Sequence, residues 1–370
     1  MVDTIYYIGA GASCYTQPLL ASMKDRMKIL LELLDEKSKY SGTLNVPGTQ
    51  ILYEKYKDVV DKAITHQTPD TYAKKLHLTK QSGELNLLKD FLNLYFHFEQ
   101  DLCKSAYKKS PWKENHGKST KDDLILTEDE KENWKKIEKV LDKRYDVFFA
   151  TLLSNKDSEL TLPPEINIIS WNYDNQFEIA FSNYCLDSSE EFRYQHAITN
   201  LKVLPYIGDY VQVNLNNWII KLNGYSTRFM RNEKWDKGQP ALIYFNFKIL
   251  LEKLINNEPV FNNIKYSWEG FTDAAYLDLP NQNITKILNT AKSKVANARN
   301  FIIIGYSFPY FNREVDSKIL SENNFDKVYI QVPDKKEFEA IKERLLSIIG
   351  LDYENRIFHR TEADQFFIPF

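Results

Sequence analysis

The stretch that decides the fold is Thr4-Ile5-Tyr6-Tyr7-Ile8, and it runs directly into Gly9-Ala10-Gly11-Ala12-Ser13. Five residues of high β propensity predict a short buried strand, which is typical of a parallel sheet. The glycines permit a tight turn and let backbone N–H groups come close to a ligand. Apolar residues at helical spacing follow from Pro18 to Glu36, so the segment predicts a strand, a phosphate-binding loop and a helix.

Further along the chain, apolar runs of strand length alternate with helical patterns. The predicted strands cover residues 166–171, 218–222, 301–305 and 328–332. The predicted helices pass through Phe177 and Phe181 and cover residues 284–298, 314–321 and 335–349. This alternation predicts an α/β fold with a Rossmann-like doubly wound parallel sheet. Ligands of such sheets bind outside the carboxyl ends of the strands.

Residues 40–159 give weaker signals. Leu85–Ala106 and Glu128–Leu153 predict amphipathic helices, whereas the polar segment Lys108–Asp123 predicts an exposed loop. We therefore expect a single domain over residues 1–370. Its Rossmann-like core would comprise residues 1–39 and 160–370, and residues 40–159 would form a mainly helical insert or small helical module.

The composition excludes several classes of protein. Lysine and arginine number 48 against 51 acidic residues, so the net charge of −3 gives no nucleic-acid signal. The three cysteines, Cys14, Cys103 and Cys185, form no CxxC pair, which excludes a four-cysteine zinc ribbon. The six histidines also lack a paired ligand spacing such as HxxxH, so we expect no metal site. The sequence has no apolar stretch long enough for a bilayer and starts without a signal-peptide pattern, so we expect a cytoplasmic protein that does not bind membranes.

Polar and glycine motifs follow the predicted strands. At Asn172-Tyr173-Asp174, the amide could hold a ribose hydroxyl, a carboxamide or a water molecule. The Asp174 carboxylate could accept a hydrogen bond from ribose or cap the next helix. Gly305-Tyr306-Ser307-Phe308 could pass close to an adenosine or form a plain turn, and the first glycine loop could likewise be a turn without a ligand.

Four segments in order resemble the sirtuin family, specifically its prokaryotic branch of antiviral defence proteins. They are Gly9–Ser13, Trp171–Asp174, Lys221–Gly224 and Ile304–Phe308. The resemblance implies NAD as the bound nucleotide, with the first loop at the pyrophosphate. It also implies that Asn172 works at the nicotinamide ribose and that Asp174, beside Tyr173, supports that pocket. The adenosine side would be lined by Gly305, Tyr306, Ser307 and Phe308.

The family resemblance implies an activity as well. Classical sirtuins deacylate lysine and carry a four-cysteine zinc module, which this sequence lacks, whereas zinc-free bacterial relatives cleave NAD to nicotinamide and ADP-ribose. We therefore expect an NAD glycohydrolase that acts as the effector of a prokaryotic abortive-infection system. Because the sequence has no GxxxxGK[ST] motif, we expect control through a homo-oligomer or a partner subunit such as an ATPase.

One residue departs from the family pattern. Asn223 stands in Lys-Leu-Asn-Gly where the family has a catalytic histidine, and an asparagine cannot take up a proton. Loss of a general base typically lowers a rate by about 10² to 10⁴. Asn223 could still orient ribose or water, with His196 as another candidate base, or it could only close a turn. The alternative function is a catalytically silent NAD or ADP-ribose sensor, or an assembly subunit.

Overall fold

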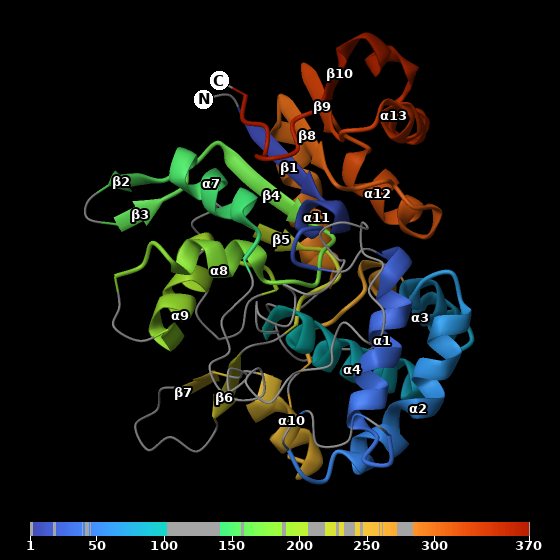
Figure 1. Cartoon of the computed structure of the whole chain (residues 1–370). Helices are drawn as coiled ribbons and strands as arrows, with labels where there is room; N and C mark the ends of the chain where they lie inside the picture. The colour runs from blue at the N-terminus through green and yellow to red at the C-terminus, as the bar shows by residue number, and fades with distance from the viewer. Residues whose placement is uncertain are drawn as a thin grey trace. The chain divides into compact units, whose positions relative to one another are not determined.

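The computed structural model describes residues 3–17, 20–38, 40, 44, 46–101, 141–156, 159–186, 190–205, 219–226, 229–232, 241–244, 247–258, 260, 262–271 and 284–369 (Figure 1). Contacts between residues divide the chain into two compact units. Unit 1 comprises residues 1–13, 141–224 and 265–370, and unit 2 comprises residues 14–140 and 225–264.

Unit 1 is built on one six-stranded parallel sheet. Its strands, in spatial order, are β10 (Ile357–Arg360), β9 (Lys327–Gln331), β8 (Asn300–Ile304), β1 (Thr4–Ile8), β4 (Ile166–Ser170) and β5 (Ile219–Lys221). Every neighbouring pair is parallel. The chain moves outward from β1 through β4 to β5, then returns to β8 and moves the other way through β9. The order therefore reverses between β1 and β8, where open α/β sheets bind their ligands.

Helices cover both faces of this sheet. Consecutive side chains of β1 point to opposite faces, and each face packs against a different helix. Tyr6 packs edge-on against Phe148 of α7 (Lys143–Leu152), with ring centroids 5.0 Å apart. Tyr7 points to the opposite face, where it hydrogen-bonds Asp316 of α12 (Arg313–Leu320). The remaining helices of unit 1 are α8 (Gln176–Ser182), α9 (Glu190–Leu201), α11 (Ile284–Asn297) and α13 (Lys335–Ile349). Unit 1 also contains shorter elements: hairpin β2 (Ser154–Lys156) and β3 (Glu159–Thr161), and the 3₁₀ turns Ala10–Ser13, Ser267–Phe271, Tyr310–Asn312 and Leu351–Arg356.

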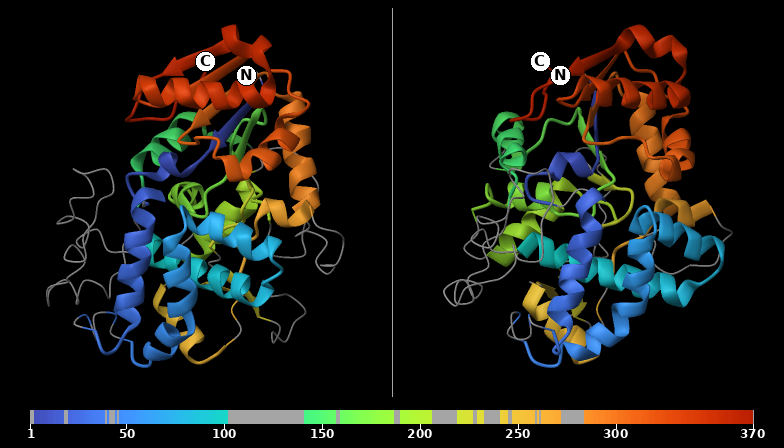
Figure 2. Two further views of the ribbon diagram at one scale, coloured as in Figure 1. Left: turned by 90° about the vertical axis from the view of Figure 1, so that its right-hand side faces the viewer. Right: turned by 45° about the vertical axis from the view of Figure 1, so that its right-hand side comes forward.

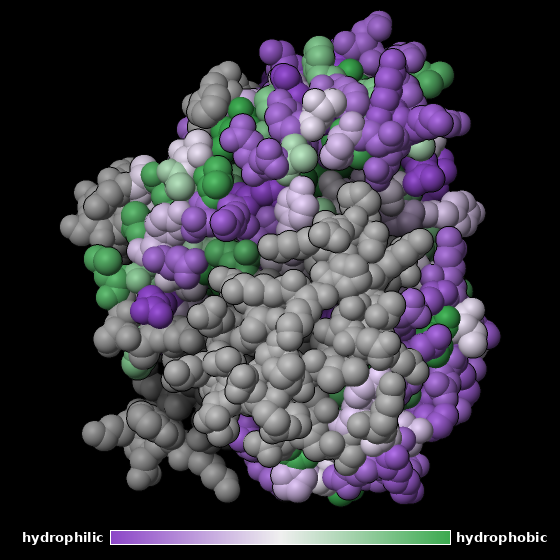
Figure 3. Space-filling model, viewed as in Figure 1, coloured by the Kyte–Doolittle hydropathy of each residue, from purple (hydrophilic) through white to green (hydrophobic). Residues whose placement is uncertain are grey.

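The last helix, α13, shows how the sequence pattern sets the surface. The Asp334 side chain accepts a hydrogen bond from the Glu337 N–H and caps its first turn. Phe338, Ile341 and Leu345 are buried on one face of the helix, which packs beside β9 (Figure 2). The outer face is polar, and the region of α12 and α13 is largely hydrophilic in Figure 3.

Unit 2 is mainly helical. It contains α1 (Leu20–Leu34), α2 (Gln50–Thr65), α3 (Pro69–Leu78), α4 (Ser82–Asp101), α10 (Phe247–Ile255) and the hairpin β6 (Phe229–Asn232) and β7 (Ala241–Tyr244). A buried pair joins α1 to α4, since the Arg26 guanidinium donates to both Glu99 carboxylate oxygens at 2.8 Å. Among the residues described in this and the other unit, no helix is long and apolar enough to cross a membrane.

The predicted α/β class and parallel sheet are confirmed. The predicted helix 335–349 matches α13 exactly in its bounds, and the five predicted strands correspond to β1, β4, β5, β8 and β9. Residue 218 and the predicted loop 108–123 lie outside the described residues, as do residues 102–106 and 128–140 of the two helices expected between 85 and 153.

Three features of the fold differ from the expectation. The expected helix 128–153 is wrong at 141–142, because α7 begins only at Lys143, where the extended Asp142 caps it by accepting from the Arg144 N–H. The sequence also missed the sixth strand, β10, and the helices α2, α3 and α9. By contacts, α7 belongs to the sheet unit and residues 14–39 belong to unit 2, whereas the sequence placed them in the insert and the core, respectively.

Candidate functional site

All four motifs singled out in the sequence lie in unit 1 at the carboxyl ends of its strands. Gly9 follows β1 and Gly305 follows β8, on either side of the point where the strand order reverses. Asn172 lies two residues beyond β4, and Asn223 lies two residues beyond β5. Because β8, β1, β4 and β5 are neighbours and parallel, the four motifs share one edge of the sheet.

The first glycine loop and the turn after β8 pack backbone against backbone. Gly9 N–H donates to the Ile304 carbonyl, and Gly11 N–H donates to the Gly305 carbonyl, each at 3.0 Å. A Cβ on Gly305 would lie 2.1 Å from the Ala12 nitrogen, and one on Gly11 would lie 2.8 Å from the Gly305 Cα. The close contact of the two turns therefore requires glycine at these positions, whether or not a ligand binds.

The same edge also exposes main chain. Ala10, Gly305 and Ser307 are exposed, whereas Ala12 and Ser13 are buried. Phe308 has a φ of +50°, which is rare for a bulky residue and marks a strained backbone. Strain of this kind is often found beside ligand sites.

An aromatic cluster with one carboxyl group supports the turn after β8. Tyr306 stacks on Trp171, with centroids 5.6 Å apart and planes 3° apart, and its hydroxyl donates to Asp316 at 2.8 Å. The Tyr7 hydroxyl donates to the other Asp316 oxygen at 2.6 Å. Burial raises the pKa of Asp316 to about 7, although hydrogen bonds from the two tyrosines oppose the shift.

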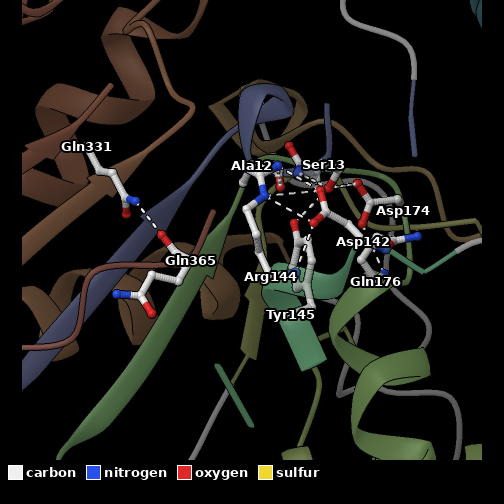
Figure 4. A network of polar contacts seen from close by, with 10 residues as sticks. Ala12, Ser13, Asp142, Arg144, Tyr145, Asp174, Gln176, Gln331 and Gln365 are labelled. Carbon is white, nitrogen blue, oxygen red and sulfur yellow. Dashed lines mark hydrogen bonds and ion pairs between the residues drawn. The ribbon is translucent and has the colours of Figure 1, made fainter. Parts of the chain in front are cut away.

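Ser13 is the centre of the polar network at the glycine loop (Figure 4). Its hydroxyl donates to Asp174 Oδ2 at 2.8 Å and lies 2.7 Å from the Tyr145 hydroxyl. The Asn172 side-chain amide donates to the same Ser13 oxygen at 3.2 Å. The structure therefore joins three sequence-predicted residues, Ser13, Asn172 and Asp174, and adds Tyr145 from α7.

The N-terminus of α7 holds the loop at a second point. Arg144 Nη2 donates to the Ala12 carbonyl at 2.8 Å and forms an ion pair with Asp142 at 2.7 Å. Gln176 Oε1 accepts from the Asp142 N–H at 2.7 Å, which links α8 to the same group. No motif in the sequence marks these residues as part of a site. The one local signal is the aspartate before Lys143, a residue type typical of helix N-caps.

Both oxygens of Asp174 are occupied. Oδ2 accepts from Ser13, and Oδ1 accepts from the Gln176 N–H at the start of α8, so the carboxylate caps this helix as well. Burial raises the pKa of Asp174, while the Lys221 ammonium acts in the opposite direction. Lys221 donates to the Asp174 carbonyl at 2.5 Å and pairs with the buried Glu178 at 2.9 Å.

Asn223 has a buried polar atom without a hydrogen-bond partner. Its side chain is only 2% exposed, its Nδ2 donates to the Tyr173 hydroxyl at 3.1 Å, and its Oδ1 is buried without a hydrogen-bond partner. The turn itself is closed by the Gly224 N–H and the Lys221 carbonyl, at 3.1 Å. The Asn223 side chain is therefore not needed for the turn, and a buried polar atom without a partner is costly unless a ligand or water satisfies it.

The sequence also offered His196 as a candidate base, and its three cysteines bear on metal binding. His196 is exposed on α9. Cys14 and Cys185 are half-buried and form no disulfide among the described residues, and Cys103 lies outside those residues. Within the ranges that the structure describes, no cluster of three or more histidine, cysteine, aspartate or glutamate side chains could hold a metal ion.

Comparison with known proteins adds no assignment, since no family model matches the chain and no curated protein matches it either.

Proposed function

We propose that the protein is an NAD glycohydrolase whose site is the carboxyl edge of the unit 1 sheet. One observation carries this proposal: the strand order β5-β4-β1-β8-β9-β10, with a glycine loop after β1 beside the point where the order reverses. This is the order of dinucleotide-binding sheets, which hold the pyrophosphate at the first glycine turn. The four motifs that resemble the sirtuin family all lie along the same edge.

The proposed roles follow from exposure and hydrogen bonding. Exposed Ala10 and half-buried Gly11 would approach the pyrophosphate with their main chain, and Gly305 with Ser307 would line the adenosine side. Asn172 would act at the nicotinamide ribose, since its amide is anchored to Ser13 on one side only. Asn223 Oδ1 would accept a hydrogen bond from the nicotinamide carboxamide or from the attacking water.

The chemistry must proceed without a base at position 223. Cleavage breaks the bond between the ribose C1′ and the nicotinamide nitrogen, water adds to C1′, and one proton is released. Asp174 is committed to Ser13 and α8, so neither Asp174 nor Asn223 is placed to take that proton. The proposal is therefore a largely dissociative cleavage, in which bond breaking leads and water loses its proton to solvent.

A second candidate function is a silent sensor that binds NAD or ADP-ribose without cleaving it. The observation that favours it is the same commitment of Asp174, together with an amide in place of a titratable group at Asn223. On either candidate, the biological setting proposed from the family resemblance is a cytoplasmic antiviral defence system. There the chain would act in a homo-oligomer or with a partner subunit such as an ATPase.

The test is nicotinamide release from NAD by purified protein, with NAD binding measured by calorimetry. Asn172→Ala should retain binding and lose most turnover, because an interaction made in the transition state changes kcat more than KM. Wild-type turnover in a folded Asn172→Ala variant would refute its role. Binding without release in the wild type would select the sensor instead.

A further inference from the structure

The hydroxyl of Ser13 makes as many hydrogen bonds as a serine hydroxyl can. A serine has one proton to donate and two lone pairs that accept. The proton goes to Asp174, so the two remaining contacts, with Tyr145 and Asn172, must both be donated to Ser13. The tyrosine hydroxyl is therefore the donor in its 2.7 Å contact with Ser13.

Tyr145 is well suited to remain a donor. It is fully buried, and its ring packs edge-on between Phe177 of α8, at 4.6 Å, and Phe366, at 4.9 Å. Burial, and next the charge of Asp174, raise the pKa of Tyr145 far above its usual value, so the phenol keeps its proton.

These donors determine which end of the Asn172 amide faces Ser13. Because the Ser13 oxygen can only accept from Asn172, the Asn172 side chain must present its NH₂ group there. Its carbonyl oxygen therefore faces away from Ser13. Among the residues that the structure describes, none hydrogen-bonds to that oxygen. A flipped amide would set two acceptors, the Asn172 oxygen and a Ser13 lone pair, against each other.

We propose that Tyr145 is a positioning residue that, through the Ser13 hydroxyl, holds Asn172 with its carbonyl oxygen turned toward the ligand. Resting on the proposed function, this defines the group that Asn172 recognises: a hydrogen-bond donor, such as a ribose hydroxyl, rather than an acceptor. Tyr145 itself does not touch the nucleotide. The Tyr145 hydroxyl donates to one lone pair of the Ser13 oxygen. With the Ser13 proton directed at Asp174, the second lone pair remains to accept from the Asn172 amide.

The experiment compares Tyr145→Phe with a matched control, Tyr6→Phe. Tyr6 is also buried in unit 1, with its ring on Phe148, but its hydroxyl has no hydrogen-bond partner. The first readout is independent of activity: the side-chain amide signals of Asn172 in ¹H–¹⁵N spectra, assigned by their loss in Asn172→Ala. Tyr145→Phe should shift these signals, whereas Tyr6→Phe should leave them in place.

The second readout is turnover of NAD. Loss of one neutral hydrogen bond should lower kcat by roughly three- to tenfold in Tyr145→Phe, with KM unchanged. In a Ser13→Ala background, adding Tyr145→Phe should change neither kcat nor the Asn172 signals, because the intermediary is gone. An equal effect of Tyr145→Phe in both backgrounds would overturn the inference, as would Asn172 signals that do not respond to Tyr145→Phe. If the wild type releases no nicotinamide, the proposed function fails, and the spectra still decide the role of Tyr145.

Discussion

Gly305→Ala tests how the two turns at the reversal point depend on each other. Gly305 has a φ of +63°, and an added Cβ would lie 2.1 Å from the Ala12 nitrogen and 2.4 Å from the Gly11 carbonyl carbon. All these atoms belong to backbone, so no side chain can rotate away. The left-handed conformation costs about 1 kcal/mol for alanine, and overpacking of this kind typically costs about 1–3 kcal/mol. We expect a loss of about 2–4 kcal/mol in the free energy of unfolding.

The assay is denaturant unfolding followed by circular dichroism, with Gly83→Ala as the control. Gly83 lies in the first turn of α4, and an added Cβ there would meet nothing within 4 Å. Alanine at such a helix position should be neutral or stabilise by up to about 1 kcal/mol. The reasoning is refuted if Gly305→Ala unfolds at the denaturant concentration of the wild type, or if it retains wild-type NAD affinity despite the displaced loop.

Two further predictions concern proton equilibria. Asn223→His would supply a base with a pKa near roughly 6.5. If the wild type is catalytically silent, the variant should gain turnover, and its pH profile should change near that pKa; if the wild type is a competent hydrolase, the variant should gain no turnover. Nicotinamide release measured between pH 5 and 9 distinguishes the two cases. The raised pKa of Asp316, about 7 against a usual 3.8, means that the folded state binds the proton more tightly than the unfolded state. Its contribution to stability is therefore complete below pH 3.8 and declines as the pH rises to about 7. Asp316→Asn should remove this decline, so the stability of the variant relative to wild type should rise between pH 4 and 7 in denaturant titrations; a constant difference would contradict the assignment.

The sequence predicts those parts of the fold that local patterns determine. Thr4–Ile8 and its glycine loop form one continuous signal, and α13 carries an N-cap and a clear apolar face. β10 was missed because its four residues, Ile357–Arg360, are only partly buried and half polar, so no apolar run marks it. The strand order follows from pairing between distant segments, which periodicity does not encode.

The residues of the candidate site likewise fall into those that the sequence marks and those that only the fold brings to the site. Asn172 and Asp174 were found because they follow a recognisable strand. Tyr145 was not found, because it lies 132 residues from Ser13 along the chain and reaches it only through the packing of α7 on the sheet. From the sequence, Gly11 could serve the approach of a phosphate or a turn without a ligand, and its contact with Gly305 now gives a packing reason. Gly11→Val would therefore disturb the loop itself, so loss of NAD binding in that variant would not identify a phosphate site.

The most direct test of the central claim is a single measurement of product formation. Wild-type protein is incubated with NAD, alone and after cross-linking or concentration to favour oligomers, and nicotinamide and ADP-ribose are quantified beside Asn172→Ala and the control Tyr6→Phe. The account predicts equal amounts of both products from wild type and Tyr6→Phe, and almost none from a folded Asn172→Ala. Absence of both products from folded wild type under every condition, with no NAD binding by calorimetry, would contradict it.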